Sequence, residues 1–143
     1  MRYEGEFLDH VSYPLGGLGA GMLCLSGTGM LESLSLRNAP DVKNEPGYFA
    51  ALSCGGTARV LEGQIPGHKV LSEGWGHGLP GRNYGLPRFR NCSFESRFPF
   101  ARIELSDPAL PLDTELAGFS PFVPGDEAAS GLPFAALEYS FTN

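Results

Sequence analysis

The sequence has little charge, little lysine and no long hydrophobic run, and these shortages exclude several classes of protein. Only 18% of residues are charged, and Lys43 and Lys69 are the only two lysines. With a net charge of −6, general affinity for nucleic acid or an anionic membrane is disfavoured. No window approaches the length of a membrane-spanning helix. The first ten residues carry three acids and no apolar core, so no signal peptide is predicted and a cytoplasmic location is expected.

The three cysteines and three histidines show no metal or redox spacing. Cys24, Cys54 and Cys92 form no C-x-x-C pair, which excludes a zinc knuckle or a thioredoxin-like motif and predicts reduced thiols. His68 and His77 lie nine residues apart without a third ligand nearby, so no metal site is predicted. No cofactor is predicted either.

A helical repeat is also missing, while glycine and proline are abundant at 20 and 12 residues. Both are poor helix formers, so the composition indicates short strands joined by turns. The sequence therefore predicts an all-β chain, an antiparallel β-sandwich that is incomplete, with a long Gly/Pro-rich loop over residues 66–92. Strands are expected at residues 21–25, 31–36, 48–53, 57–61, 98–105, 112–119 and 132–141.

The glycine run Gly16, Gly17, Gly19 and Gly21 does not fit a phosphate-binding loop. The G-x-G-x-x-G frame that starts at Gly17 meets Met22 where glycine is required, and no G-K-S or G-K-T follows. Glycines also permit close approach by another backbone or surface, and we favour that mechanical interpretation. The carboxylates are scattered, and their spacing does not place two of them across a sugar-sized gap as glycosidase chemistry requires. No G-x-S-x-G nucleophile motif occurs.

The predicted loop holds the strongest candidates for contact with a sugar. Trp75, His77, Arg82 and Tyr84 lie in it, and a flat aromatic side chain suits the apolar face of a pyranose. The alternative is that Trp75 pins the loop to the sandwich. Aromatics and arginines also interleave over residues 82–102, but in an acidic chain these arginines are expected to pair with carboxylates rather than bind RNA.

Two stretches resemble the N-terminal domain of glycoside hydrolase family 116. They are residues 13–21 (YPLGGLGAG), followed by residues 35–41 (SLRNAPD), and residues 119–134 (FSPFVPGDEAASGLPF), followed by a strand that ends at Asn143. The family includes non-lysosomal glucosylceramidases and bacterial β-glucosidases. The resemblance implies part of a β-sandwich domain, residues 1–143, that packs against an (α/α)6 catalytic barrel. It also implies a retaining β-glucosidase without a cofactor, whose glutamate nucleophile and aspartate acid/base lie in the barrel and have no counterpart here.

Two functions follow as expectations. The first is a non-catalytic N-terminal domain that buttresses the barrel, with Gly16, Gly17, Gly19, Gly21, Arg37 and Asp41 at the domain contact and the β-glucoside bound by the complete enzyme. The second is a stand-alone carbohydrate-binding or scaffold sandwich that uses Trp75, His77, Arg82 and Tyr84. The apolar/polar alternation over residues 137–141 is the best strand pattern in the chain. An unpaired edge is therefore expected there, and the isolated chain is expected to associate.

Overall fold

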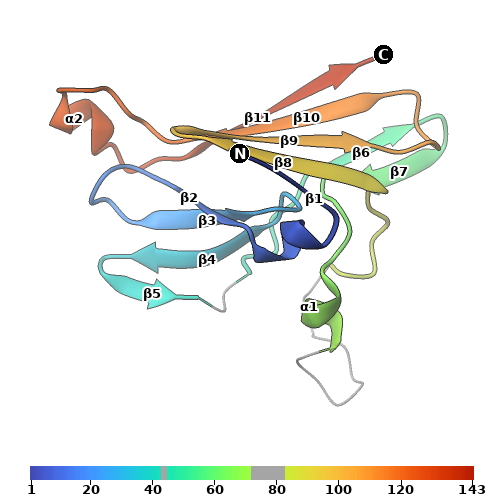
Figure 1. The fold of residues 1–143 in the computed structure, drawn as a ribbon, viewed down its shortest axis with the longest axis horizontal. Coiled ribbons are helices and arrows are strands. Elements are labelled where there is room, and N and C mark those ends of the chain that lie inside the picture. The colour runs from blue at the N-terminus through green and yellow to red at the C-terminus, as the bar shows by residue number, and fades with distance from the viewer. Residues whose placement is uncertain (43–44, 72–82) are drawn as a thin grey trace.

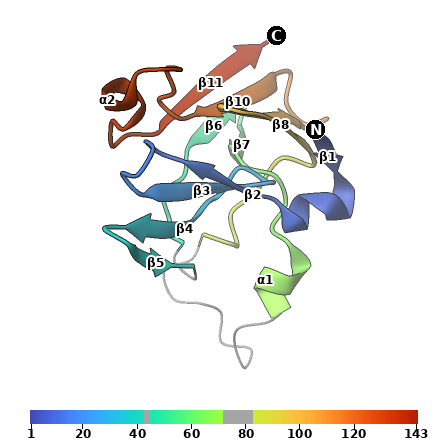
Figure 2. The same ribbon diagram turned by 60° about the vertical axis from the view of Figure 1, so that its left-hand side comes forward.

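The computed structural model describes residues 1–42, 45–71 and 83–143, which form two facing antiparallel sheets and a separate hairpin (Figure 1). The predicted all-β class and antiparallel sandwich are confirmed. Seen after a 60° turn, the larger sheet lies above the smaller one, and the two termini lie on the larger sheet's side (Figure 2).

The larger sheet has five strands, and its hydrogen-bonded order differs from chain order at one place, because the N-terminal strand pairs with a strand from the middle of the chain. In spatial order it contains β1 (Arg2–Glu4), β8 (Asn91–Arg97), β9 (Phe100–Ser106), β10 (Asp113–Phe119) and β11 (Ala136–Thr142). Alternation of buried and exposed residues in β9 and β10 gives this sheet one core face and one outer face. β11 is an edge strand, as the sequence predicts.

The smaller sheet follows chain order, and a two-stranded hairpin stands apart from it. The four-stranded sheet contains β2 (Ser12–Leu15), β3 (Met22–Ser26), β4 (Leu31–Leu36) and β5 (Ala39–Asp41), and the hairpin contains β6 (Ala51–Cys54) and β7 (Thr57–Val60). Gly55 and Gly56 connect the hairpin with φ of 58° and 81°. Positive φ at both central residues is one of the two turn geometries that two-residue hairpins favour, and it suits a Gly-Gly pair.

The core lies between the two sheets. Leu15 and Leu25 come from the smaller sheet, and Phe94, Ile103 and Leu116 come from the larger one; each is at most 1% exposed. Gly118 lets the sheets approach, because a Cβ there would lie 3.0 Å from a methyl carbon of Leu25 and 3.1 Å from one of Leu15.

Among the described residues, three short helical segments and four strands were not predicted from the sequence. The helical segments are η1 (Gly5–His10), α1 (Gly67–Leu71) and α2 (Glu127–Ser130), and the strands are β1, β2, β5 and β8. The Gly/Pro-rich loop predicted at about residues 66–92 contains the short helix α1 near its start and meets β8 at Asn91, and residues 72–82 of it lie outside the described residues. Among the described residues no helix has both the length and the apolar character needed to cross a membrane.

Candidate functional site

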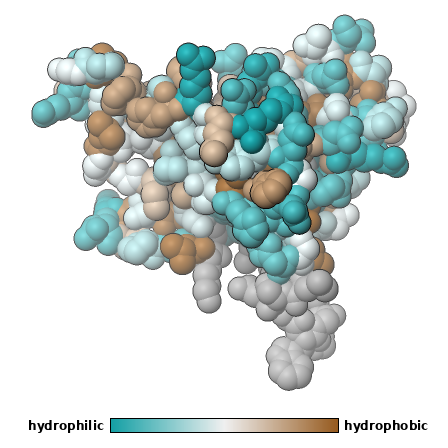
Figure 3. Space-filling model, in the orientation of Figure 1, coloured by the Kyte–Doolittle hydropathy of each residue, from teal (hydrophilic) through white to brown (hydrophobic). Residues whose placement is uncertain are grey.

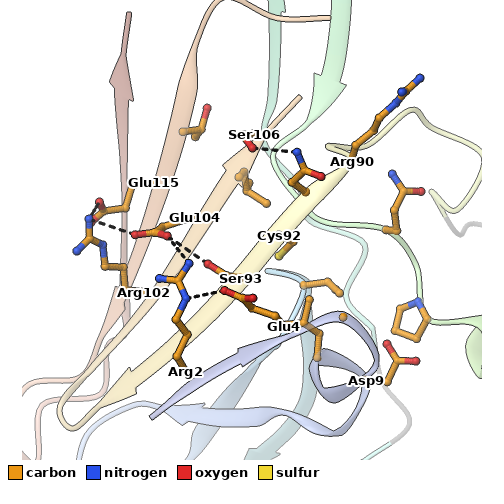
Figure 4. Close-up of a pocket in the computed structure, with 18 of the residues that line it drawn as sticks. Arg2, Glu4, Asp9, Arg90, Cys92, Ser93, Arg102, Glu104, Ser106 and Glu115 are labelled. Carbon is orange, nitrogen blue, oxygen red and sulfur yellow. Dashed lines mark hydrogen bonds and ion pairs between the residues drawn. The ribbon is translucent and has the colours of Figure 1, made fainter. Parts of the chain in front are cut away.

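A groove of about 990 Å³ runs from the outer face of the larger sheet past the start of β8 to η1 and the segment before α1 (Figure 4). We call it the polar groove. Charged and hydroxyl side chains line its sheet side: Arg2, Glu4, Ser93, Arg102, Glu104 and Glu115. None of the described residues that line it is aromatic.

Strand register explains why these side chains meet. Glu4 lies opposite Ser93, Ser93 opposite Glu104, and Glu104 opposite Glu115, which gives one row across four strands. Like charges directly opposite one another repel, and arginine in the neighbouring row offsets the repulsion between these carboxylates. There Arg2 donates to Glu4 at 2.7 Å and to Glu104 at 2.9 Å.

Arg102 completes this compensation on the other side of the row. It pairs with Glu115, and its guanidinium lies 3.7 Å from a carboxylate oxygen of Glu104 (Figure 4). The side chains of Arg102 and Glu104 are 50% and 44% exposed, so solvent screens these ion pairs and each contributes little stability.

Glu104 and Glu115 are not arranged as a catalytic pair for hydrolysis of a glycosidic bond. The hydrogen bond from Arg2 lowers the pKa of Glu104 below its usual value, whereas a general acid needs a raised pKa. Glu104 and Glu115 lie side by side on one face of the sheet. The two catalytic acids of a glycosidase instead lie on opposite sides of the bound sugar. In the described part of the chain, no three His, Cys, Asp or Glu side chains are placed to hold a metal ion.

The glycine run forms the loop between β2 and β3, and it packs closely against the segment around α2. A Cβ on Gly17 would lie 2.2 Å from the carbonyl oxygen of Leu132. The Leu18 amide donates to the Ser130 carbonyl at 2.8 Å, and the Gly16 amide donates to the Ser120 hydroxyl at 3.0 Å. The two stretches that carry the family resemblance therefore touch each other, and glycine is required for that contact.

The other predicted contact residues lie in different surroundings. At Gly21 a Cβ would lie 2.5 Å from the Ser35 carbonyl oxygen, whereas nothing lies within 4 Å of a Cβ at Gly19, whose φ is +74°. Arg37 forms part of the β4–β5 turn with φ of 52° and is exposed, and Asp41 is exposed on β5. The β4–β5 turn lies at the same end of the smaller sheet as the loop between β2 and β3 (Figure 2). The role of these residues at a domain contact remains a prediction.

Of the predicted sugar-contact residues, only Tyr84 can be placed. Trp75, His77 and Arg82 lie outside the described residues. Tyr84 is half-buried, and its hydroxyl donates to Glu45 at 2.6 Å. The second carboxylate oxygen of Glu45 accepts from Lys69 at 3.0 Å. One carboxylate thus connects α1 to the segment that begins at residue 83.

A buried ion pair holds the next part of this segment. Arg88 donates to Glu62 at 3.1 Å, and the two side chains are 2% and 5% exposed. The remaining donors of Arg88 reach Asn83 and the backbone carbonyls of Tyr84 and Leu86. The arginine is therefore satisfied inside the protein, in agreement with the expectation that these arginines pair with acids.

Sequence reasoning missed the polar groove because its members are widely separated in the chain. The available signal was local: Arg2 and Glu4, like Arg102 and Glu104, are charged residues two positions apart, which places both on one face of a strand. Joining these pairs requires the pairing of β1 with β8, and a contact across about ninety residues cannot be read from strand periodicity.

Comparison with known proteins agrees with the resemblance described above. A search of curated proteins found no match. A family model described as "beta-glucosidase 2, glycosyl-hydrolase family 116 N-term" matches residues 12–143, which is most of the chain. The chain belongs to the family of glycosyl-hydrolase family 116 N-terminal domains.

Proposed function

We propose that this chain is a non-catalytic domain that supports the catalytic (α/α)6 domain of a family 116 glycoside hydrolase. The observation that carries the proposal is the family match over residues 12–143. The polar groove agrees with a non-catalytic role, because the hydrogen bond from Arg2 lowers the pKa of Glu104 and Glu115 is paired with Arg102. In this proposal the β-glucoside is bound and cleaved, with retention, by residues of the catalytic domain, and the hydrolysis uses no cofactor.

The finer assignments belong to the same proposal. The substrate class is a β-glucoside, with glucosylceramide as one candidate. A reducing, cytoplasmic compartment is proposed because all three cysteines are free thiols. The loop with Gly16, Gly17, Gly19 and Gly21 lies beside the contact with the catalytic domain, together with Arg37 and Asp41.

An assay of aryl β-glucoside hydrolysis tests this proposal. The chain alone should show no turnover. The catalytic domain of a family 116 enzyme, supplied as a separate polypeptide, should retain activity longer during heating when the chain is present, because binding to the native state stabilises it. Turnover by the chain alone would contradict the proposal, as would an identical inactivation rate with and without the chain.

The polar groove favours a second candidate, an oligosaccharide-binding sandwich without a catalytic partner. Its hydroxyl, carboxylate and guanidinium groups can hydrogen-bond to sugar hydroxyls, and Trp75, His77, Arg82 and Tyr84 remain the predicted stacking and polar contacts. Calorimetric titration with cellobiose tests this function. Binding that is lost on Glu104→Ala, or on Trp75→Ala, would support it, whereas absence of binding by the unmodified chain would exclude it for this sugar.

A further inference from the structure

Large apolar side chains gather at one end of the sandwich and stay exposed. The exposed fractions are 59% for Leu18, 62% for Phe98, 38% for Phe122, 48% for Val123, 48% for Leu132 and 46% for Phe134. We call these six residues the apolar end. Figure 3 shows hydrophobic side chains gathered on the left, over the region where Figure 1 places α2 and the neighbouring strand ends.

Contacts join the β8–β9 turn, the segment before α2, α2 itself and the β2–β3 loop. The rings of Phe98 and Phe122 meet edge to face with their centroids 4.9 Å apart. The Ser130 hydroxyl accepts from the Val123 amide at 2.9 Å and donates to the Val123 carbonyl at 3.0 Å. The same Ser130 accepts the Leu18 amide through its carbonyl. The apolar end is therefore fixed before any partner binds, which lowers the entropy cost of binding.

The surface has little charge. Residues 11–31, 116–125 and 128–137 contain no Asp, Glu, Lys or Arg, although they run through the exposed loops. Two acids, Asp126 and Glu127, lie between these stretches, and the exposed Arg97 precedes Phe98. Asp126 caps α2 by accepting the Ala129 amide at 2.9 Å. A monomeric protein rarely exposes a contiguous apolar patch without a binding role.

The apolar end is formed largely by the glycine loop and by residues 119–134. These are the two stretches through which the chain resembles its family, and they touch at Gly17. These stretches supply exposed side chains rather than only core residues. At the polar groove, by contrast, charged side chains form ion pairs with one another.

We infer that the apolar end is the surface that binds the catalytic domain, and that the binding face of that domain is apolar. This inference rests on the proposed function and specifies where the contact lies. The partner's apolar side chains cover Leu18, Phe122 and Phe134, while Asp126 and Glu127 face basic groups at its rim. The polar groove stays open in the complex.

Affinity measurements with matched variants test the inference. The catalytic domain of a family 116 enzyme is immobilised, and its Kd for the chain is measured by biolayer interferometry. Leu18→Lys and Phe134→Lys should each weaken binding by about tenfold or more, because each places a charge in a desolvated contact. The control is Phe7→Lys on η1, since Phe7 is 62% exposed but lies beside the polar groove; it should change the Kd by less than about twofold.

Hydrogen exchange on the unmodified chain gives a second readout that does not depend on the folding of a variant. Binding should slow exchange in residues 16–20 and 120–135 and leave β8 and β9 unchanged. If the chain binds but the footprint and the affected variants lie elsewhere, the inference is overturned and the proposed function stands. If the unmodified chain does not bind, the proposed function fails and the inference fails with it.

Discussion

Replacement of Gly17 by alanine should destabilise the protein strongly, although it adds a single methyl group. The new Cβ would lie 2.2 Å from the Leu132 carbonyl oxygen and 2.8 Å from the Gly131 carbonyl carbon. Ordinary contact begins at 3.4 Å, so this backbone must move by more than 1 Å. Overpacking of this kind costs about 1–3 kcal/mol. Loss of the Leu18–Ser130 hydrogen bond adds about 1 kcal/mol, so the expected total is about 2–4 kcal/mol.

Urea denaturation followed by circular dichroism measures this loss of unfolding free energy. In a thermal melt the Tm should fall by about 6–12 °C, as expected for a domain of this length. Gly85→Ala is the matched control, since Gly85 has no positive φ and a Cβ there meets nothing within 4 Å. It should leave stability unchanged or slightly raised, because alanine restricts the unfolded chain. Equal stability of the two variants would refute the claim that residues 131–132 pack directly on Gly17.

Three further predictions follow from buried groups and from the free sheet edge. Arg88→Met should lower the free energy of unfolding by about 3–5 kcal/mol at neutral pH, because it leaves the buried Glu62 charge unpaired. Burial already raises the pKa of Glu62, so this loss should shrink as the pH falls and Glu62 protonates. A loss that does not change with pH would contradict the prediction. Burial raises the pKa of Cys92 to about 12, so a thiol reagent at pH 8 should label the half-buried Cys54 first; labelling of Cys92 at a similar rate would oppose that order. Phe141, 48% exposed on the edge strand β11, should promote association, and Phe141→Lys should raise the monomer fraction in sedimentation; an unmodified chain that stays monomeric at high concentration would disprove it.

The sequence predicted the elements whose pattern is local and strong. The expected strand over residues 31–36 coincides with β4, and those over 57–61 and 112–119 differ from β7 and β10 by one residue at one end. In β10 apolar Leu116 faces the core while Glu115 faces outward, and this period of two can be seen without knowledge of the partner strand.

The missed elements depend on partners that are distant in the chain. β8 reads Asn-Cys-Ser-Phe-Glu-Ser-Arg, with only Cys92 and Phe94 apolar, and lies between arginine-rich residues. It is a strand because β1 and β9 pair with its two sides. The helices α1 and α2, of five and four residues, are too short for helical periodicity to be recognised. Asp126 is the N-cap of α2, and its side chain accepts the Ala129 amide.

The candidate site also has one feature that the sequence predicted and one that it could not predict. Glycines in the run predicted a close approach, and the structure shows one between the glycine loop and Leu132. The polar groove could not be predicted, because it depends on the register of β1, β8, β9 and β10, which sets Glu104 opposite Glu115 and brings Arg2 within reach. Local pattern thus predicted where the backbone packs, while long-range register determined where the charges meet.

Sedimentation velocity of this chain mixed with an equimolar catalytic domain of a family 116 glycoside hydrolase tests the central claim most directly. The account predicts a single boundary that sediments faster than either component and contains both. Two boundaries with the coefficients of the separate proteins, at concentrations well above micromolar, would contradict it.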